Sequence, residues 1–405
     1  VIAGLLVVGI AASALSNMGL PTQSQPLERL SEAEKARLAE MFHLRQRLGH
    51  EVWPGWGQAR IPVIVHNEAY AFLVGYPEGE TPPDGWVRMP WDENLGGPWE
   101  AVPGDAFQGQ VYYRQQLAGP EETPENFTVR VGDHWAATLW TREYAKISMV
   151  SGLRQELPPF LRPIVPWRLV WRVLMGATET YVGALAHEAF HAYQGMEAPE
   201  RLAAAEFAAS MEERYLWDDD AAEGAWQDEL DALHGAVEAS SDAEAAELVQ
   251  RFLALREERR QGHGLSSDLV DYERQLEWLE GLAKYAELAS QRQAALDEDY
   301  EPVPGIDGDP DFHAYRDRER YWRRQVDEIR RLSGRGGEAR FYQSGFGQAV
   351  LLDRFMPGWK ARAFSEDVWL EGLLAEALGS PYVAASASRA VSEGAVSNER
   401  LCRSR

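Results

Sequence analysis

The stretch TETYVGALAHEAFHAYQ, residues 178–194, decides how this chain is interpreted. Tyr181, Leu185 and Ala189 recur at the spacing of one face of an α-helix, and no proline interrupts the run. We therefore predict a helix over residues 178–194, with Gly195 as the residue just beyond its C-terminal end.

Two histidines lie four residues apart in this expected helix, His187 and His191. That spacing places both imidazoles on one face, about one turn apart, where they can share one ion. Neutral imidazole is a common ligand of catalytic zinc. Glu188 between them is placed to take a proton from a metal-bound water and pass it to a leaving amine. The pattern predicts a zinc site that hydrolyses peptide bonds, and the alternative is a pair of surface histidines on an ordinary helix.

A catalytic zinc needs a third protein ligand, and the residues directly after His191 do not supply one. We predict Glu280, at the edge of an apolar stripe on a helix over about residues 270–291. A carboxylate on a core-facing surface is costly unless it is paired or bound to a metal. Gly281 beside it lowers helix propensity and indicates the close approach of another element. The alternatives are a Glu280 paired with an arginine, or another ligand, in the order Glu277, Glu273 and His263.

The two motifs, His187-Glu188-x-x-His191 and Glu280-Gly281-Leu282-Ala283-x-Tyr285, resemble those of the gluzincin group of zinc metallopeptidases over roughly residues 178–290. Thermolysin-like peptidases belong to this group. The resemblance implies an α+β zincin-like fold and one Zn²⁺ held by His187, His191 and Glu280. It also implies Glu188 as the general base and a peptide or protein as the substrate. An edge strand of the N-terminal part would pair with an extended peptide.

The chain departs from that pattern at Lys284. Thermolysin-like enzymes carry an Asp four residues after the ligand Glu, where it supports a zinc-bound His, and Lys284 occupies that position here. Glu287 is the candidate for the supporting carboxylate. No Gly-x-Met-x-Asn motif lies upstream, so aminopeptidase specificity is not supported.

The group also uses a Tyr or His to stabilise the oxyanion of the tetrahedral intermediate. Tyr342, in a helix-like stretch that begins at Ala339, is our candidate for this role. Tyr285 and Tyr193 are alternatives, and a packed aromatic is the other interpretation of Tyr342.

The secondary structure expected from the sequence changes from mainly strands to mainly helices along the chain. Residues 31–150 form an expected β-rich part, which opens on a helix capped by Ser31 with Glu34 as its capping-box partner. Residues 151–405 form an expected helical zinc-binding part, with an acidic helical insertion at about 198–262. Strands are expected at 61–66, 70–74, 110–114 and 127–131. Runs of strands followed by runs of helices predict the α+β class.

Two segments have the residue composition of membrane-associated sequences. Residues 1–20 are apolar and small, as in a secretory signal peptide or a retained anchor, or else in a buried N-terminal helix; residues 21–30 are a polar linker. Residues 158–175 interleave Trp167 and Trp171 with arginines, which suits a membrane interface or a hydrophobic connector packed on the domain. We therefore expect an exported protein, secreted or membrane-anchored, with the catalytic part outside the cytoplasm.

The composition of the chain disfavours some classes of partner and of catalytic mechanism. A formal net charge of −24 disfavours nucleic acid as a partner, because phosphates would be repelled. The one cysteine, Cys402, cannot form an internal disulfide and lies among polar tail residues, which disfavours a cysteine nucleophile. The competing class is a catalytically inactive zincin-like protein that keeps the fold for binding or scaffolding at the cell surface.

Overall fold

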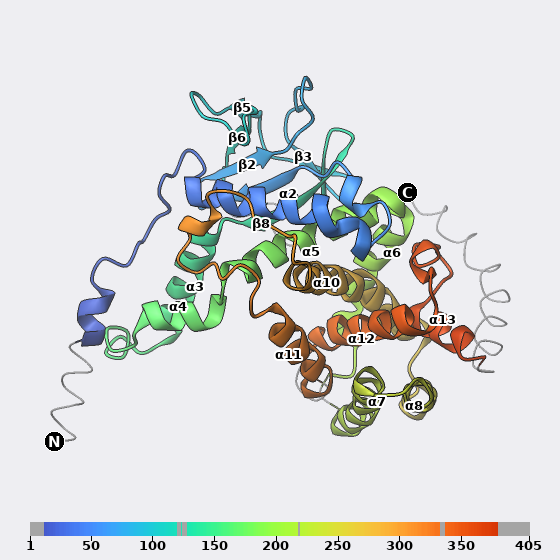
Figure 1. The fold of residues 1–405 in the computed structure, drawn as a ribbon. Helices are drawn as coiled ribbons and strands as arrows, with labels where there is room; N and C mark the ends of the chain where they lie inside the picture. Colours follow the sequence, from blue (N-terminus) through green and yellow to red (C-terminus); the bar gives the residue numbers. More distant parts are fainter. Residues whose placement is uncertain (1–11, 120–122, 124–127, 218, 333–336, 380–405) are drawn as a thin grey trace, which may run out of the picture. The chain divides into compact units, whose positions relative to one another are not determined.

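The computed structural model describes residues 12–119, 123, 128–217, 219–332 and 337–379. Strands lie between residues 63 and 140, and the described chain after residue 141 is mostly helical (Figure 1). The expected α+β class is confirmed at this level. The described residues of Val1–Glu197 and Ala286–Glu319 form one compact unit, and those of Ala198–Tyr285 and Arg320–Arg405 form a second. The domain boundaries expected from the sequence stay predictions.

The first unit contains an eight-stranded sheet in the order β4-β3-β7-β8-β1-β2-β6-β5. Its only parallel pair within the described residues is β1 with β8. The strands are β1 Val63–His66, β2 Tyr70–Val74, β3 Trp86–Arg88, β4 Glu93–Leu95, β5 Glu100–Ala101, β6 Tyr113–Gln116, β7 Val129–Val131 and β8 His134–Trp140.

The expected strands at 61–66 and 70–74 are present as β1 and β2. The expected strand at 110–114 is shifted, because β6 starts only at Tyr113. Phe127 lies outside the described residues, and the rest of its expected strand contains β7. The strands β3, β4, β5 and β8 were not expected. The edges of the sheet are the short strands β4 and β5, and pairing with a peptide stays a prediction.

The two faces of the sheet pack differently. Ile64, Leu73 and Ala136 belong to an apolar cluster on one face, together with Trp86 and Trp99. Side chains alternate along a strand, so Trp135 lies on the opposite face from Ala136. That second face meets α5, since Trp135 lies against Gly195 of that helix.

The helices of the first unit surround the sheet's second face (Figure 1). Helix α5 contacts both β8 and α2. The helices are α2 Glu32–Val52, α3 Arg142–Glu156, α4 Trp167–Met175 and α5 Thr178–Glu197, with short 3-10 turns η1 Trp56–Gln58 and η5 Ile306–Gly308.

Ser31 caps α2 as expected, with its hydroxyl accepting from the Glu34 amide at 3.2 Å. The Glu34 carboxylate makes tertiary bonds in addition. It accepts from the Tyr181 hydroxyl, and from the Arg142 amide at 3.3 Å. The buried carboxylate therefore joins α2 to α3 and α5.

The expected end of α5 at Gly195 is wrong, because the helix continues to Glu197. A Cβ at Gly195 would lie 2.5 Å from the Trp135 ring. Gly195 is therefore the point at which β8 packs closely on the helix, and it does not terminate the helix.

Residues 12–17 are helical and bond to the segment that precedes α4. Ser13 donates to the Ile164 carbonyl, Asn17 donates to the Val165 carbonyl at 2.8 Å, and the Trp167 amide donates to the Asn17 side chain at 3.2 Å. Trp167 and Trp171 are buried, as in the connector alternative for residues 158–175. Most of the expected signal or anchor, residues 1–11, lies outside the described residues, as does Cys402. Among described residues no helix combines the length and apolarity needed to cross a membrane.

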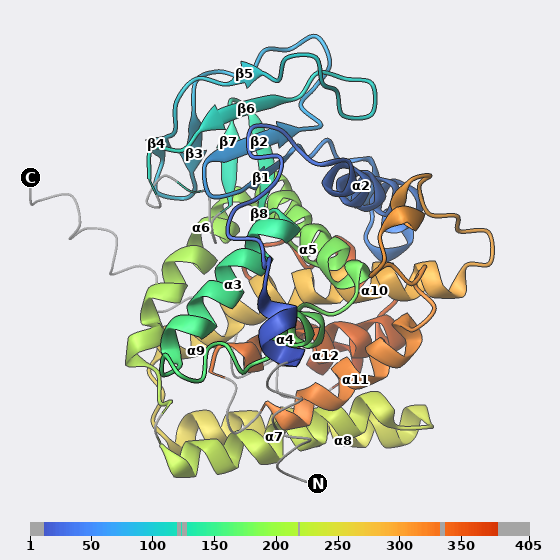
Figure 2. The same ribbon diagram turned by 90° about the vertical axis from the view of Figure 1, so that its left-hand side faces the viewer.

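The second unit is helical. Helices α7 and α8 form an antiparallel pair, seen side by side in Figures 1 and 2. The elements are α6 Pro199–Ala208, η3 Ala209–Arg214, α7 Asp220–Glu238, α8 Asp242–Gly262, α9 Ser267–Leu276, the π-helical turn η4 Glu277–Gly281, α10 Leu282–Leu296, α11 Arg318–Arg331, α12 Ala339–Phe355, η6 Trp359–Ala361 and α13 Leu370–Ala377. Helix α10 continues into the first unit from Ala286.

Residues 198–262 are helical, as expected, and they also supply buried charge. Arginines of α8 and α9 meet glutamates of α7, α9, η4 and α13 in what we call the Arg/Glu network: Arg256, Arg259, Arg260 and Arg274 with Glu229, Glu273, Glu277 and Glu371. Four positive and four negative groups balance. Pairing of this kind is required, because an unpaired buried charge costs several kcal/mol.

Because of the Arg/Glu network, the free energy of unfolding depends on pH in the acidic range. Burial alone would raise the pKa of Glu273, but Arg259 and Arg260 outweigh it and lower the pKa to about 2. A carboxylate with a depressed folded-state pKa stabilises the fold above its unfolded pKa, near 4.5, and this stability is lost as the pH falls towards 2. The shift corresponds to about 3 kcal/mol. We expect urea unfolding midpoints, measured with chelator present, to fall steadily from pH 5 to pH 3.

Glu273→Gln is the matched variant for this prediction. It should be less stable than the parent at pH 7, and its midpoint should change less between pH 5 and pH 3. Equal slopes for the two proteins would contradict the role assigned to Glu273.

Candidate metal centre

The site is built where α5 and α10 run in opposite directions at close range. A Cβ at Gly183 would lie 2.0 Å from the Gln291 amide nitrogen and 3.2 Å from Cγ of Glu287. A methyl group at this position would displace the Gln291 amide, so glycine lets the two helices approach with that side chain in place. Gly183 lies one turn before His187 on the same face of α5, so the contact brings Glu287 to the first histidine.

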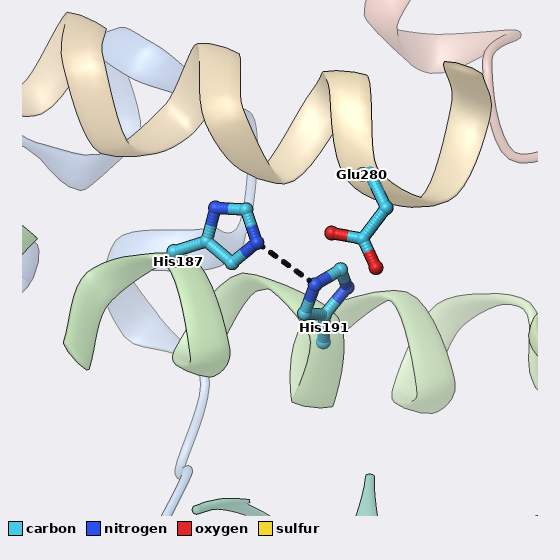
Figure 3. A group of neighbouring side chains, drawn as sticks. All are labelled: His187, His191 and Glu280. Carbon is cyan, nitrogen blue, oxygen red and sulfur yellow. Dashed lines mark hydrogen bonds between the residues drawn. The ribbon is translucent and has the colours of Figure 1, made fainter. Parts of the chain in front are cut away.

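The two histidines face each other as the four-residue spacing predicts. Nε2 of His187 and Nε2 of His191 are 3.1 Å apart (Figure 3). Both residues are buried, each with 8% of its surface exposed. Their ring nitrogens therefore converge on one point that is largely shielded from solvent.

The other nitrogen of each ring faces an oxygen. Nδ1 of His191 lies 2.9 Å from Oε1 of Gln194, and Nδ1 of His187 lies 3.5 Å from Oε2 of Glu287. When each Nδ1 carries the proton that such an oxygen accepts, both Nε2 lone pairs point at the same place. Two lone pairs 3.1 Å apart need a proton or a cation between them.

Glu280 completes the group. One ligand atom from each of His187, His191 and Glu280 lies within 4.8 Å of the others. Figure 3 shows the carboxylate of Glu280 directed towards His191 from the neighbouring helix. Among the described residues these three are the set of His, Cys, Asp and Glu that can hold a metal ion.

The residues fit zinc chemically. Two nitrogens at about 2.0–2.1 Å from a tetrahedral zinc lie about 3.4 Å apart, close to the observed 3.1 Å. Two imidazoles and one carboxylate form a known catalytic donor set that leaves a fourth position for water. The oxygens on both Nδ1 atoms are the outer partners that fix the tautomer of a ligand histidine. The arrangement accommodates zinc but does not by itself identify the metal.

Glu188 lies beside the histidines on α5 and is half-buried. It follows His187 directly, so its side chain leaves the helix about 100° around the axis from that ligand. It is thus next to the metal group without being one of the three converging residues.

The alternative ligands are occupied elsewhere. Glu277 is paired with Arg256 and Glu273 with Arg259, both in the Arg/Glu network. Nδ1 of His263 lies 3.8 Å from Asp219, which caps α7. Among the candidates from the sequence, Glu280 is the residue that joins the histidines.

Tyr342 lies on α12 and is half-buried. Its neighbour four residues earlier, Glu338, is close to Glu280: burial raises the pKa of Glu338, and the charges of Glu212 and Glu280 add to that rise. Residues three and four apart share a helix face, so Tyr342 is on the side of α12 that carries Glu338 and Gly345, and Gly345 packs against Gly281 next to Glu280.

The alternative tyrosines donate their hydroxyls elsewhere. The Tyr193 hydroxyl donates to the Pro54 carbonyl at 2.7 Å, and burial raises its pKa to about 12. The Tyr285 hydroxyl donates to Asp353 and accepts from Lys360 at 2.8 Å.

Sequence reasoning missed Gln194. Its amide oxygen holds His191, as Glu287 faces His187. Gln194 lies three residues after His191, so helical spacing alone could have placed it beside the ring. Lys284 occupies the position at which thermolysin-like enzymes carry Asp, and here the carboxylate near His187 comes from Glu287, three residues later.

Comparison with known proteins finds no matching family model, no matching curated protein and no matching solved structure.

Proposed function

We propose that this chain is a zinc-dependent peptidase of the gluzincin type, with a zincin-like fold, that hydrolyses peptide bonds. The observation that carries the proposal is the convergence of His187, His191 and Glu280 within 4.8 Å, with Glu188 adjacent on the same helix. Two imidazoles, one carboxylate and a neighbouring glutamate are the groups that metal-assisted hydrolysis requires.

Zinc held by these three residues would polarise the scissile carbonyl and lower the pKa of the attacking water. Glu188 would act as the general base, taking a proton from the attacking water and later delivering it to the nitrogen of the leaving amine. Gln194 and Glu287 would keep the histidines oriented, with both Nε2 atoms directed towards one point near Glu280.

The reaction also requires a group that stabilises the oxyanion, and Tyr342 is our candidate for this role. Its hydroxyl would donate a hydrogen bond to the substrate oxygen that becomes negative in the tetrahedral intermediate. The support is its place on α12, on the face that carries Glu338 and lies near Glu280.

A zincin-like scaffold without activity remains the second candidate, since a metal can also be structural. The half-buried Glu188 favours catalysis, because a structural site needs no general base.

The test is metal analysis of the full chain together with cleavage of a mixed peptide library followed by mass spectrometry. We expect one zinc per chain, and cleavage that a chelator abolishes and added Zn²⁺ restores. Absence of zinc would overturn the whole proposal. Bound zinc with no cleavage of any peptide would support the scaffold alternative instead.

A further inference from the structure

Glu280 lies in η4, a π-helical turn between α9 and α10. Such turns are rare, occur mostly inside α-helices and are frequent at functional sites. One extra residue in a turn rotates the side chains on either side by about 100° relative to each other. The turn therefore sets the direction in which the Glu280 carboxylate leaves the helix.

Helix α12 packs directly on the backbone of this turn. A Cβ at Gly281 would lie 2.4 Å from Cα of Gly345. A Cβ at Gly345 would lie 2.4 Å from the Glu277 carbonyl oxygen and 2.7 Å from Cα of Gly281. Both partners are backbone, so neither can move aside cheaply, and the glycine pair holds η4 against α12.

Hydrogen bonds to the Glu277 side chain, including an ion pair, also hold the π turn. Arg256 donates to both oxygens of Glu277, at 2.5 and 2.8 Å, and the Ser344 hydroxyl also donates to Glu277 at 2.5 Å. All three side chains are buried. Bidentate arginine–carboxylate pairs fix geometry as well as charge. The Arg/Glu network thus ends on the π turn, three residues from the ligand carboxylate.

We propose that Arg256, Ser344 and Gly345 are positioning residues that aim Glu280 at the metal by fixing the π turn. The inference rests on the proposed metal site and adds how its third ligand is held. None of the three is among the converging ligands: Arg256 and Ser344 act through the Glu277 side chain, and Gly345 acts through the backbone of η4.

The experiment uses the full chain with Gly345→Ala and Ser344→Ala. Zinc affinity is measured by competition with a chromogenic chelator. The visible absorption of the Co²⁺-loaded protein reports the ligand geometry. We expect about 10-fold weaker zinc binding in Gly345→Ala, a smaller loss in Ser344→Ala, and an altered Co²⁺ spectrum in both.

Gly347→Ala is the matched control on the same helix. The atoms nearest its Cβ would be side-chain atoms of Leu233 and Ile329, at 3.0–3.1 Å, whereas the nearest atoms at Gly345 belong to the backbone of η4. It should lower the urea midpoint without changing zinc affinity or the Co²⁺ spectrum. That contrast separates aiming of the ligand from general loss of stability.

The outcomes separate this inference from the proposed function. If the unmodified chain binds no zinc, the proposed function fails and this inference fails with it. If it binds zinc, and Gly345→Ala matches Gly347→Ala in affinity and spectrum, only the positioning role is overturned. Should Gly345→Ala fail to fold, Ser344→Ala decides by the same two readouts.

Discussion

We expect the replacement of Glu188 by Gln to abolish peptide hydrolysis and to leave zinc bound. The amide has the size of the carboxylate but cannot take a proton from water, so the general base is lost. General-base catalysis contributes about 10²–10⁴-fold, and we expect kcat to fall by at least 10². Metal content should stay near one per chain, because Glu188 is not among the converging ligands. Activity on the best library peptide and metal analysis of the same sample test this.

Glu197→Gln is the control, since this glutamate is the last residue of the same helix and is exposed. The Glu197→Gln protein should keep full activity.

Tyr342→Phe is the informative comparison, and removal of one oxyanion donor should lower kcat by about 10²–10³ with the zinc retained. A Glu188→Gln protein within about threefold of the parent would remove Glu188 from the mechanism.

We expect the replacement of Glu280 by Ala to remove the third ligand of the proposed zinc site and with it most of the metal affinity. Two histidines alone leave zinc under-coordinated, and we expect affinity to fall by at least about 10². Bound metal stabilises the folded state in proportion to its affinity. Zinc should therefore raise the melting temperature of the parent protein and have little effect on that of the variant. Chelator competition and thermal unfolding with and without Zn²⁺ measure both effects.

Glu338→Gln controls for the loss of negative charge near the site. Glu338 is close enough to Glu280 for their charges to interact, and it accepts from the Tyr272 hydroxyl, as glutamine still can. It should bind zinc within about threefold of the parent. Equal affinity in Glu280→Ala and the parent would mean that another residue, or water, supplies the third ligand.

The helix that carries the site could be predicted from sequence because its information is local. Four-residue spacing fixes the relation of His187 to His191, and the apolar stripe fixes which face is buried. Gly281 was likewise readable as a place of close approach, and it lies against Gly345. Gly195, by contrast, led to a wrong prediction of the helix end. A glycine near a helix end indicates either termination or close packing, and here Gly195 packs on Trp135.

The acidic stretch shows why other features were not predictable. The acidic run at residues 218–220 is typical of a solvated face, and Asp219 does serve as an exposed helix cap. Yet Glu229 and Arg256, within the same insertion at 198–262, are fully buried. Burial of a charge depends on a partner, and the partners of Arg256 lie 21 and 115 residues away in the chain. No local pattern records that pairing.

The sequence by itself determined the α+β class, the helix over residues 178–194 and the face on which two histidines meet. It also named Glu280, from the cost of leaving a carboxylate beside an apolar stripe. Only the tertiary structure decided that Glu280 rather than Glu277 reaches the histidines, since Glu277 is held by Arg256. It likewise decided which oxygens face Nδ1 of each ring. The physical reason is that spacing fixes direction around one helix, whereas contact between two helices depends on how closely they approach, here set by Gly183.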